Sequence, residues 1–257
     1  MSVRFELKEG VAIITLARPE KFNSVSADLS RELVEALERA GRDARAAVLT
    51  GEGKAFCAGA DLADLMGEYE SGGPDLDSVI GERFNPMVAA LINVQVPTIA
   101  AINGVAAGAG MGLALACDMR VMSSDAFFLS AFIGLALIPD TGSTWLLVKH
   151  LGLSRALEFT ATNRRIGAEE AASLGLAKQA PPEDLLPTAT ALAAGLAAGP
   201  TSAYVANRRI LYSAAATDIM TALATERTTQ GVLGKSALHL EGMNAFLEKR
   251  QADFNAT

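Results

Sequence analysis

Two glycine-rich turns are able to present backbone amides to a substrate. The first is KAFCAGADL, residues 54–62, and the second is GVAAGAGMGLALACD, residues 104–118. Both lie where an expected strand leads into an expected helix, so one N–H from each turn could point at the same oxygen. In such an oxyanion hole each donor supplies about 2.7–4 kcal/mol of transition-state stabilisation. Small residues suit this role because side chains would obstruct a substrate carbonyl.

The second turn also has other interpretations. It fits neither the full dinucleotide fingerprint nor the GxxxxGK[ST] phosphate loop, and close packing of a helix against a strand explains its glycines equally well. No charged side chain occurs from Phe84 to Cys117, a length sufficient for a membrane span. Asn93, Pro97 and Asn103 interrupt this stretch. We therefore expect a buried strand followed by a tightly packed helix.

Composition narrows the function classes. The chain has 257 residues, 50% of them hydrophobic and 20% charged, with a net charge of −7. This is enough apolar material for a large α/β core, and without a basic stripe a nucleic-acid partner is not expected. The cysteines and histidines are too scattered for a disulfide framework or a metal site, and they are Cys57, Cys117, His150 and His239. The start MSVRFELKEG lacks an apolar signal core, which predicts a cytoplasmic protein without a membrane partner.

The pattern along the chain predicts strands alternating with helices, and then a run of helices. A hairpin is expected to turn at Glu9-Gly10, and a helix capped by Ser26 or Asp28 to stop at Gly41. Further strands are expected at AAVLTG, TIAAIN, MRVMS and AFFLS, and helices near 62–66 and 78–94, with a mobile loop at YESGGPDLD. After Pro139 almost everything is expected to be helical. The predicted class is α/β, with a core over residues 1–195 and a helical region over 196–257.

Several motifs in order resemble the crotonase (enoyl-CoA hydratase/isomerase) family over nearly the whole chain. They are LARPEKFNSVS, GEGKAFCAGADLADL, PTIAAINGVAAGAGMGLALACDMRV, AFFLSAFIGLALIPDTGSTWLL, NRRIGAEEAASLGLAKQ and GMNAFLEKR. The resemblance implies a fold of repeated ββα units and a C-terminal helical region that forms trimers, often stacked as hexamers. It also implies a coenzyme A thioester substrate and no separate cofactor.

The resemblance further implies where the substrate binds. The oxyanion-hole amides would belong to Ala58 and Ala109, the latter in place of the usual glycine. The thioester and coenzyme path would be lined by Ala58, Gly59, Ala60, Asp61 and Leu62, with Lys21, Phe22 and Ser24 as weaker coenzyme contacts and Phe132 nearby. No metal is implied.

The chain departs from the hydratase pattern at both catalytic glutamates. By motif position these fall on Gly112 and Phe132, and neither can transfer a proton, whereas water addition needs two such groups. Asp140 remains. By itself, Pro-Asp-Thr-Gly predicts a type I turn with the aspartate capping the next helix. However, AFIGLALIPDTGSTWLL resembles the enoyl-CoA isomerases of phenylacetate catabolism, in which this aspartate is the acid/base.

The resulting hypothesis is an isomerase. Asp140 would take the C2 proton of a 3-enoyl thioester and return it to C4, in a dry pocket that raises the pKa of the carboxylate. The pocket would be formed by Phe132, Ile133, Leu135, Leu137 and Ile138. An enoyl-CoA hydratase and a catalytically silent acyl-CoA-binding protein remain as alternatives.

Other side chains have plainer expected roles. Cys57 is expected to be a small buried residue, Asp61 to orient the following helix, and Asp118 to hydrogen-bond locally. Trp145 is expected to pack. Asp64, Glu68 and Glu70 could approach an acyl chain but are weak catalytic candidates.

Overall fold

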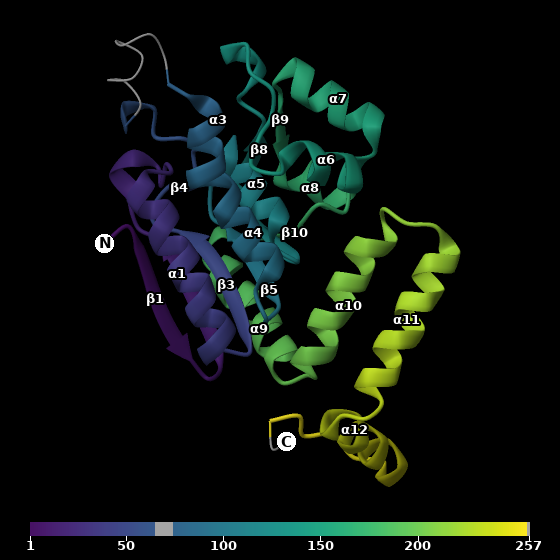
Figure 1. The fold of residues 1–257 in the computed structure, drawn as a ribbon. Coiled ribbons are helices and arrows are strands. Elements are labelled where there is room, and N and C mark those ends of the chain that lie inside the picture. Colours follow the sequence, from purple (N-terminus) through teal and green to yellow (C-terminus); the bar gives the residue numbers. More distant parts are fainter. Residues whose placement is uncertain (65–73, 256–257) are drawn as a thin grey trace.

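The main sheet has six strands in the order β1-β2-β3-β5-β7-β10 (Figure 1). The computed structural model describes residues 1–64 and 74–255. The β1–β2 hairpin is antiparallel and turns at Glu9 and Gly10, as predicted, and the other neighbouring strands run parallel. The six strands are β1 (Val3–Lys8), β2 (Val11–Leu16), β3 (Ala46–Gly51), β5 (Thr98–Ile102), β7 (Met119–Ser123) and β10 (Lys178–Ala180).

A second sheet has four short strands in the order β4-β6-β8-β9. They are β4 (Ala55–Cys57), β6 (Val105–Ala107), β8 (Phe127–Leu129) and β9 (Arg165–Gly167). Consecutive strands alternate between the two sheets, since β3, β5 and β7 of the main sheet are each followed by a strand of the second one. Helices then lead back to the main sheet. This arrangement confirms the expected α/β fold of repeated ββα units.

The helices between the strands bury their apolar faces on the sheets. α1 begins at the predicted cap, where the Ser26 hydroxyl accepts the Leu29 N–H, but it runs two residues past Gly41. A π-helical turn, Ile80–Phe84, joins α3 to α4. The bounds are α1 (Ala27–Asp43), α3 (Leu76–Val79), α4 (Asn85–Asn93), α5 (Ala109–Ala116), α6 (Ser143–Leu151), α7 (Leu153–Thr162), α8 (Ala168–Ser173), α9 (Leu185–Ala197), α10 (Thr201–Ala214), α11 (Ile219–Leu233) and α12 (Ala237–Glu248).

Several predictions about the secondary structure need correction. The region after Pro139 is less helical than expected, because β9 and β10 lie within it, and β4 lies within the expected 51–61 loop. These strands have three residues each, too few for an alternating pattern to show. The helix expected over 62–66 is described only for residues 62–64, and residues 65–73 of the following segment lie outside the described part. At the end of YESGGPDLD, Leu76 already begins α3.

The second glycine-rich turn is a core element. All eight residues of α5 are buried, and a Cβ atom at Gly110 would lie 2.1 Å from the Cys57 carbonyl oxygen. A Cβ atom at Gly104 would lie 2.1 Å from the Lys54 carbonyl oxygen, and one at Gly51 would lie 2.2 Å from the Ala55 carbonyl oxygen. Since no side chain tolerates such distances, glycine brings the backbone of the second turn against that of the first.

The C-terminal helices project away from the sheets (Figure 1). α9 packs on the main sheet through Leu185, Ala189 and Ala193, whereas α11 has no buried residue and α12 has one. A buried ion pair joins α10 to the core, with 2.9 Å between Arg208 Nη1 and Asp118 Oδ2. The expectation that Asp118 bonds locally is therefore wrong. No helix within residues 1–64 and 74–255 combines the length and the apolarity that crossing a bilayer requires.

The packing of α5 makes a prediction about two glycines. Gly110→Ala forces a methyl group into the Cys57 carbonyl, so we expect it to lower the free energy of unfolding by about 3 kcal/mol or more. Gly195→Ala in α9 is the matched control, because nothing lies within 4 Å of its Cβ position. It should be neutral or stabilising by up to about 1 kcal/mol. Urea denaturation measures both, and equal effects of the two substitutions would contradict the close approach.

Candidate active site

Three chain segments meet at the first turn of α5. A Cβ atom at Gly59 would lie 3.7 Å from the Ala109 nitrogen. The turn that follows β4, here called the β4 turn, therefore touches the start of α5. A Cβ atom at Gly108 would lie 3.7 Å from Cζ of Phe132, and one at Gly112 would lie 2.5 Å from the Thr141 carbonyl oxygen. The structure thus brings together the two glycine-rich turns and the segment that carries Phe132 and Asp140.

The predicted role of the Ala58 amide is wrong. Its N–H donates to the Phe22 carbonyl oxygen at 3.0 Å, so it is committed to the protein backbone. Phe22 has a positive φ of 50°, which turns its carbonyl toward Ala58. The PEKFNS segment, residues 19–24, therefore supports the β4 turn, residues 58–62. An oxyanion needs a donor that has no internal acceptor.

The Ala60 amide meets this requirement. Val25 and Ala60 form a parallel bridge in which Val25 N–H donates to Gly59 O and Asp61 N–H donates to Val25 O. Alternation along an extended chain then directs the Ala60 N–H away from Val25. The Ala109 N–H belongs to the first turn of α5, where helical amides have no intrahelical acceptor. Within the described residues neither of these two N–H groups has a hydrogen-bond acceptor.

Asn23 organises this region, and sequence reasoning missed it. Its side chain is fully buried, its amide donates to the carbonyl oxygens of Glu52 and Ala55, and its Oδ1 accepts the Arg18 N–H. Its φ of 56° is positive, a conformation that asparagine tolerates better than most residues. The sequence holds no clear signal for this role beyond the asparagine itself, because its three partners lie on the backbone.

Asp61 is a structural residue, as expected. Its Oδ2 lies 2.7 Å from Arg18 Nη2 in a pair whose side chains are 17% and 6% exposed, and its Oδ1 accepts the Ala63 N–H. Because its backbone N–H is also used, Asp61 has no free donor for a substrate, and its predicted binding role is not supported. The pair instead joins Arg18, the residue before the PEKFNS segment, to the turn that carries Ala60.

The other predicted coenzyme contacts differ in accessibility. Lys21, Phe22 and Leu62 are exposed beside the β4 turn, and their binding roles stay predictions. Ser24 is only 7% exposed, and its carbonyl accepts Arg18 Nη1, so it offers little surface to a ligand. Asp64 is exposed, while Glu68 and Glu70 lie outside the described residues. Cys57 is the expected small buried residue, and burial raises the pKa of its thiol to about 12.

Asp140 is half-buried and does not cap α6. Its carbonyl accepts the Ser143 N–H, and φ is 52° at Thr141 and 73° at Gly142. Positive values at both central positions make this a type I′ turn, so the predicted type I turn is wrong. The carboxylate accepts the Thr141 hydroxyl at 2.6 Å. Burial raises the pKa of Asp140, and the Thr141 hydrogen bond opposes that rise.

The expected dry pocket is incomplete. Phe132 is buried at 8% exposure, but the neighbouring apolar side chains are exposed, Ile133 at 50%, Leu135 at 59%, Leu137 at 37% and Ile138 at 79%. They form an apolar ridge beside Asp140. A ligand or a partner chain would have to cover it before the carboxylate became dry.

A separate cavity lies at the other end of α5. Its volume is about 460 Å³, and it is lined by Asp118, Trp145, His150, Tyr204, Arg208 and Tyr212. α5 spans eight residues, so its two ends are about 12 Å apart, and the lining of the cavity does not include Gly59, Ala60 or Ala109. Trp145 is 41% exposed and pairs with Tyr212 at 5.5 Å. No group of three metal-binding side chains occurs among residues 1–64 and 74–255.

The raised pKa of Asp140 predicts how stability depends on pH. Its contribution to stability is full below the ordinary value of 3.8 and is lost as pH rises through the folded-state pKa. Asp140→Asn stays uncharged, so we expect its Tm at pH 7 to exceed that of the parent by about 2 °C or more. This difference should shrink toward pH 4. Asp125→Asn in an exposed loop is the control, and an equal gain there would contradict the assignment.

Comparisons with known proteins show the family and the fold. The enoyl-CoA hydratase/isomerase profile matches residues 6–257. The chain is 43% identical over 254 residues to the probable enoyl-CoA hydratase of Rhodobacter capsulatus, covering 98% of this chain and 97% of that protein. It is 39% identical over 251 residues to the 1,2-epoxyphenylacetyl-CoA isomerase of Escherichia coli, covering 96% of each. An enoyl-CoA hydratase structure from Bacillus anthracis matches with a TM-score of 0.92 at 31% identity, covering 100% of both chains. The chain therefore belongs to the enoyl-CoA hydratase/isomerase family and has the crotonase fold.

Proposed function

We propose that this protein moves the double bond of an enoyl-CoA thioester, with Asp140 as the group that carries the proton. The observation behind the proposal is the packing at Gly112. A Cβ atom there would lie 2.5 Å from Thr141 O and 2.9 Å from Ser143 Oγ, so the residues after Asp140 occupy the space that a glutamate would need. At the two positions that resemble those of the hydratase glutamates, the described site then offers no acid/base group, and Asp140 is the proposed replacement.

The amides of Ala60 and Ala109 would bind the thioester oxygen. Among the residues that the structure describes, neither N–H group has an acceptor, and their segments touch through Gly59. When the C2 proton leaves, negative charge moves to this oxygen, and two fixed donors together with the positive end of α5 stabilise it. Ala60 thus replaces Ala58 in the proposed oxyanion hole.

Asp140 would then act on both sides of the dienolate. Its carboxylate removes the C2 proton of a 3-enoyl thioester and returns it to C4, which yields the conjugated 2-enoyl product without consuming water. Partial burial raises the pKa of the carboxylate, so the base is strengthened toward the acidity of the proton that it takes. A bound acyl chain lying on Leu135, Leu137 and Ile138 would complete the drying of the site.

A hydratase is the second candidate, because the 43% identical relative from Rhodobacter capsulatus carries that name. In that case Asp140 would activate water, and a second acid would be required. The two positions that resemble those of the hydratase glutamates are Gly112 and Phe132 in this chain.

A pair of substrates tests the reaction. With a 3-enoyl-CoA we expect absorbance of the conjugated thioester to rise, and with a 2-enoyl-CoA we expect no loss. Asp140→Asn should lower the isomerisation rate at least about a hundredfold, the scale of a lost acid/base group. Asp125→Asn is the control and should keep the parental rate. Loss of the 2-enoyl signal would favour the hydratase, and silence of the unaltered protein with both substrates would favour an acyl-CoA-binding protein.

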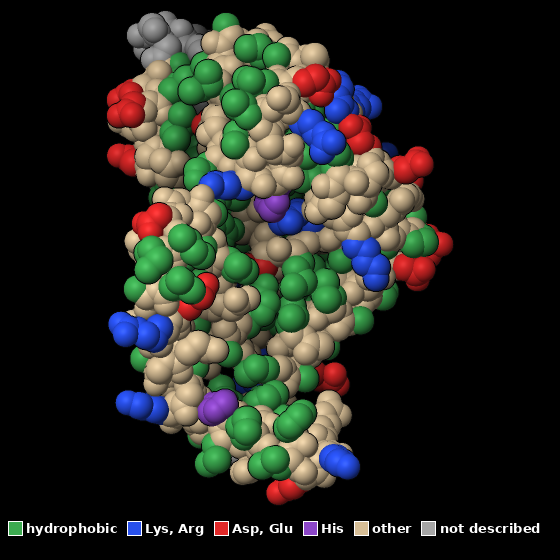
Figure 2. All heavy atoms as spheres, turned by 90° about the vertical axis from the view of Figure 1, so that its right-hand side faces the viewer, with side chains coloured by type: hydrophobic (Ala, Val, Ile, Leu, Met, Phe, Trp, Pro, Cys, Tyr) green, Lys and Arg blue, Asp and Glu red, His purple; other side chains and the backbone are tan. Residues whose placement is uncertain are grey.

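The C-terminal helices would assemble the chain into trimers. Figure 2 shows apolar side chains in several clusters over the lower part of the molecule. α11 and α12 expose Ile219 at 68%, Met220 at 70%, Val232 at 69%, Phe246 at 78% and Leu247 at 71%. Helices in proteins gain most of their stability by burying an apolar face against other elements, so further copies of the chain are the proposed cover.

A cytoplasmic location also stays a prediction.

Light scattering tests the assembly. We expect the mass of three chains or a multiple of it, and Phe246→Glu together with Leu247→Glu should shift the protein toward the monomer. Glu226→Gln on α11 is the control, since it leaves the apolar faces intact. A monomeric parent protein at micromolar concentration would exclude the proposed trimer.

A further inference from the structure

A side chain from the end of α7 makes a hydrogen bond to the segment between β8 and α6. This segment carries both Phe132 and Asp140, and its residues Ala131, Ala136 and Thr141 have positive φ angles of 65°, 56° and 52°. Such angles are unfavourable for residues other than glycine, so the surrounding structure must maintain them. Within the described chain, the hydrogen bond from the Ala131 N–H to Asn163 Oδ1, 2.7 Å long, joins residues 131–139 to another element. The other hydrogen bonds of residues 131–139 stay within that stretch.

Asn163 is well placed to hold this segment. It ends α7 with φ 50° and ψ 32°, a left-handed conformation that asparagine tolerates. The same side chain lies over the next turn of the segment, because a Cβ atom at Gly134 would be 3.9 Å from Asn163 Nδ2. Its Oδ1 therefore fixes the residue immediately before Phe132.

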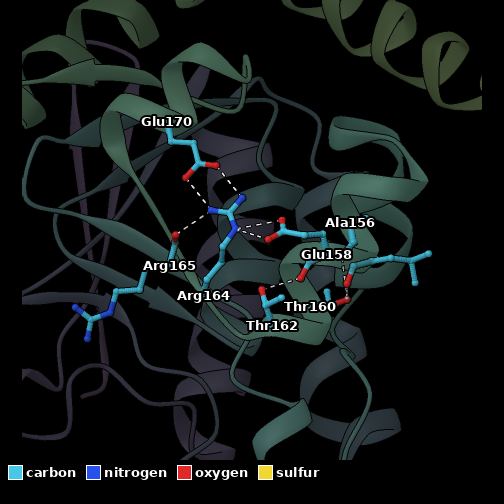
Figure 3. Close-up of polar contacts among 8 residues, drawn as sticks. Ala156, Glu158, Thr160, Thr162, Arg164, Arg165 and Glu170 are labelled. Atoms are coloured by element: carbon cyan, nitrogen blue, oxygen red, sulfur yellow. Dashed lines mark hydrogen bonds and ion pairs between the residues drawn. The ribbon is translucent and has the colours of Figure 1, made fainter.

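The neighbouring Arg164 fixes Asn163 in turn. The Arg164 guanidinium binds Glu170 of α8 through two hydrogen bonds of 2.8 Å, and its Nε lies 2.8 Å from Glu158 Oε1 of α7. Figure 3 shows Arg164 between these two carboxylates, while Arg165 points away from them. The Thr162 hydroxyl also bonds to the Glu158 carbonyl at 2.8 Å. Paired charge-assisted bonds of this kind impose a definite geometry, so the turn at Asn163 is tied to two helices.

We propose that Asn163 is a positioning residue for the acyl site, acting through Ala131 on Phe132. The Phe132 ring packs over Gly108, which precedes the proposed oxyanion donor Ala109. Its position therefore sets the wall beside the thioester carbonyl. This inference rests on the proposed binding of an acyl thioester at Ala109. It assigns Asn163 no contact with the substrate.

Two substitutions separate the hydrogen bond from the backbone conformation. Asn163→Gly keeps the left-handed conformation accessible and removes the acceptor, whereas Asn163→Asp keeps an acceptor at the same place. Calorimetric titration of the full-length protein with butanoyl-CoA and with free coenzyme A provides the readout. The saturated thioester cannot isomerise, so binding is measured independently of the proton transfer by Asp140.

We expect Asn163→Gly to weaken butanoyl-CoA binding about fivefold, the scale of one lost hydrogen bond, and to leave coenzyme A binding unchanged. Asn163→Asp should bind both ligands as the parent does. Parental butanoyl-CoA binding by Asn163→Gly would overturn the inference, and so would equal weakening for both ligands, which indicates general destabilisation. If the parent binds butanoyl-CoA no better than coenzyme A, both the acyl site and this inference fail. If the parent discriminates but does not isomerise, only the proposed reaction fails.

Discussion

The close approach of α5 to the β4 turn is the contact on which the rest of the site depends. At Gly110 the helix backbone lies against the Cys57 carbonyl, where a Cβ atom would be only 2.1 Å away. This distance leaves the first turn of a fully buried helix beside the Gly59–Ala60 backbone. In the proposed site, the backbone N–H groups of Ala60 and Ala109 can then both donate to the thioester oxygen, and no side chain is needed as a donor. The chemistry proposed here thus begins as a packing constraint.

The supports of these turns are polar and specific. Asn23 bonds to three backbone groups, and the Arg18–Asp61 pair links the residue before the PEKFNS segment to the β4 turn. Asn163 performs a similar task for the segment that leads to Asp140. Left-handed backbone at Asn23 and Asn163 is common to both supports. An asparagine at such a position combines a tolerated conformation with a side chain able to bond a nearby backbone.

Packing around Gly112 connects the fold to the choice of reaction. The type I′ turn at Thr141-Gly142 places the Thr141 carbonyl and the Ser143 hydroxyl over the helix, where a larger residue has no room. The same turn presents Asp140, whose carboxylate is tuned by burial in one direction and by the Thr141 hydroxyl in the other. In the proposed reaction, the same turn therefore fills the space beside Gly112 and presents the carboxylate that carries the proton.

The sequence by itself determined the α/β class, the hairpin, most of the strands and the family, because alternating patterns, glycine clusters and ordered motifs are local signals. It also predicted a site made of Asp140, Ala109 and Phe132, and the structure brings the segments that carry these residues together. Only the tertiary structure decided that the Ala58 N–H donates to the Phe22 carbonyl and that Asp118 pairs with Arg208. It also decided that the Ala60 N–H has no acceptor within the described residues. It likewise revealed the short strands β4, β6, β9 and β10 and the hydrogen bond from Ala131 to Asn163. These contacts join residues that lie about 30 to 90 positions apart in the chain. The Ala60 N–H also depends on which side of the Val25–Ala60 bridge it faces. Residue identity does not carry that information, because alanine offers the same amide at position 58 as at position 60.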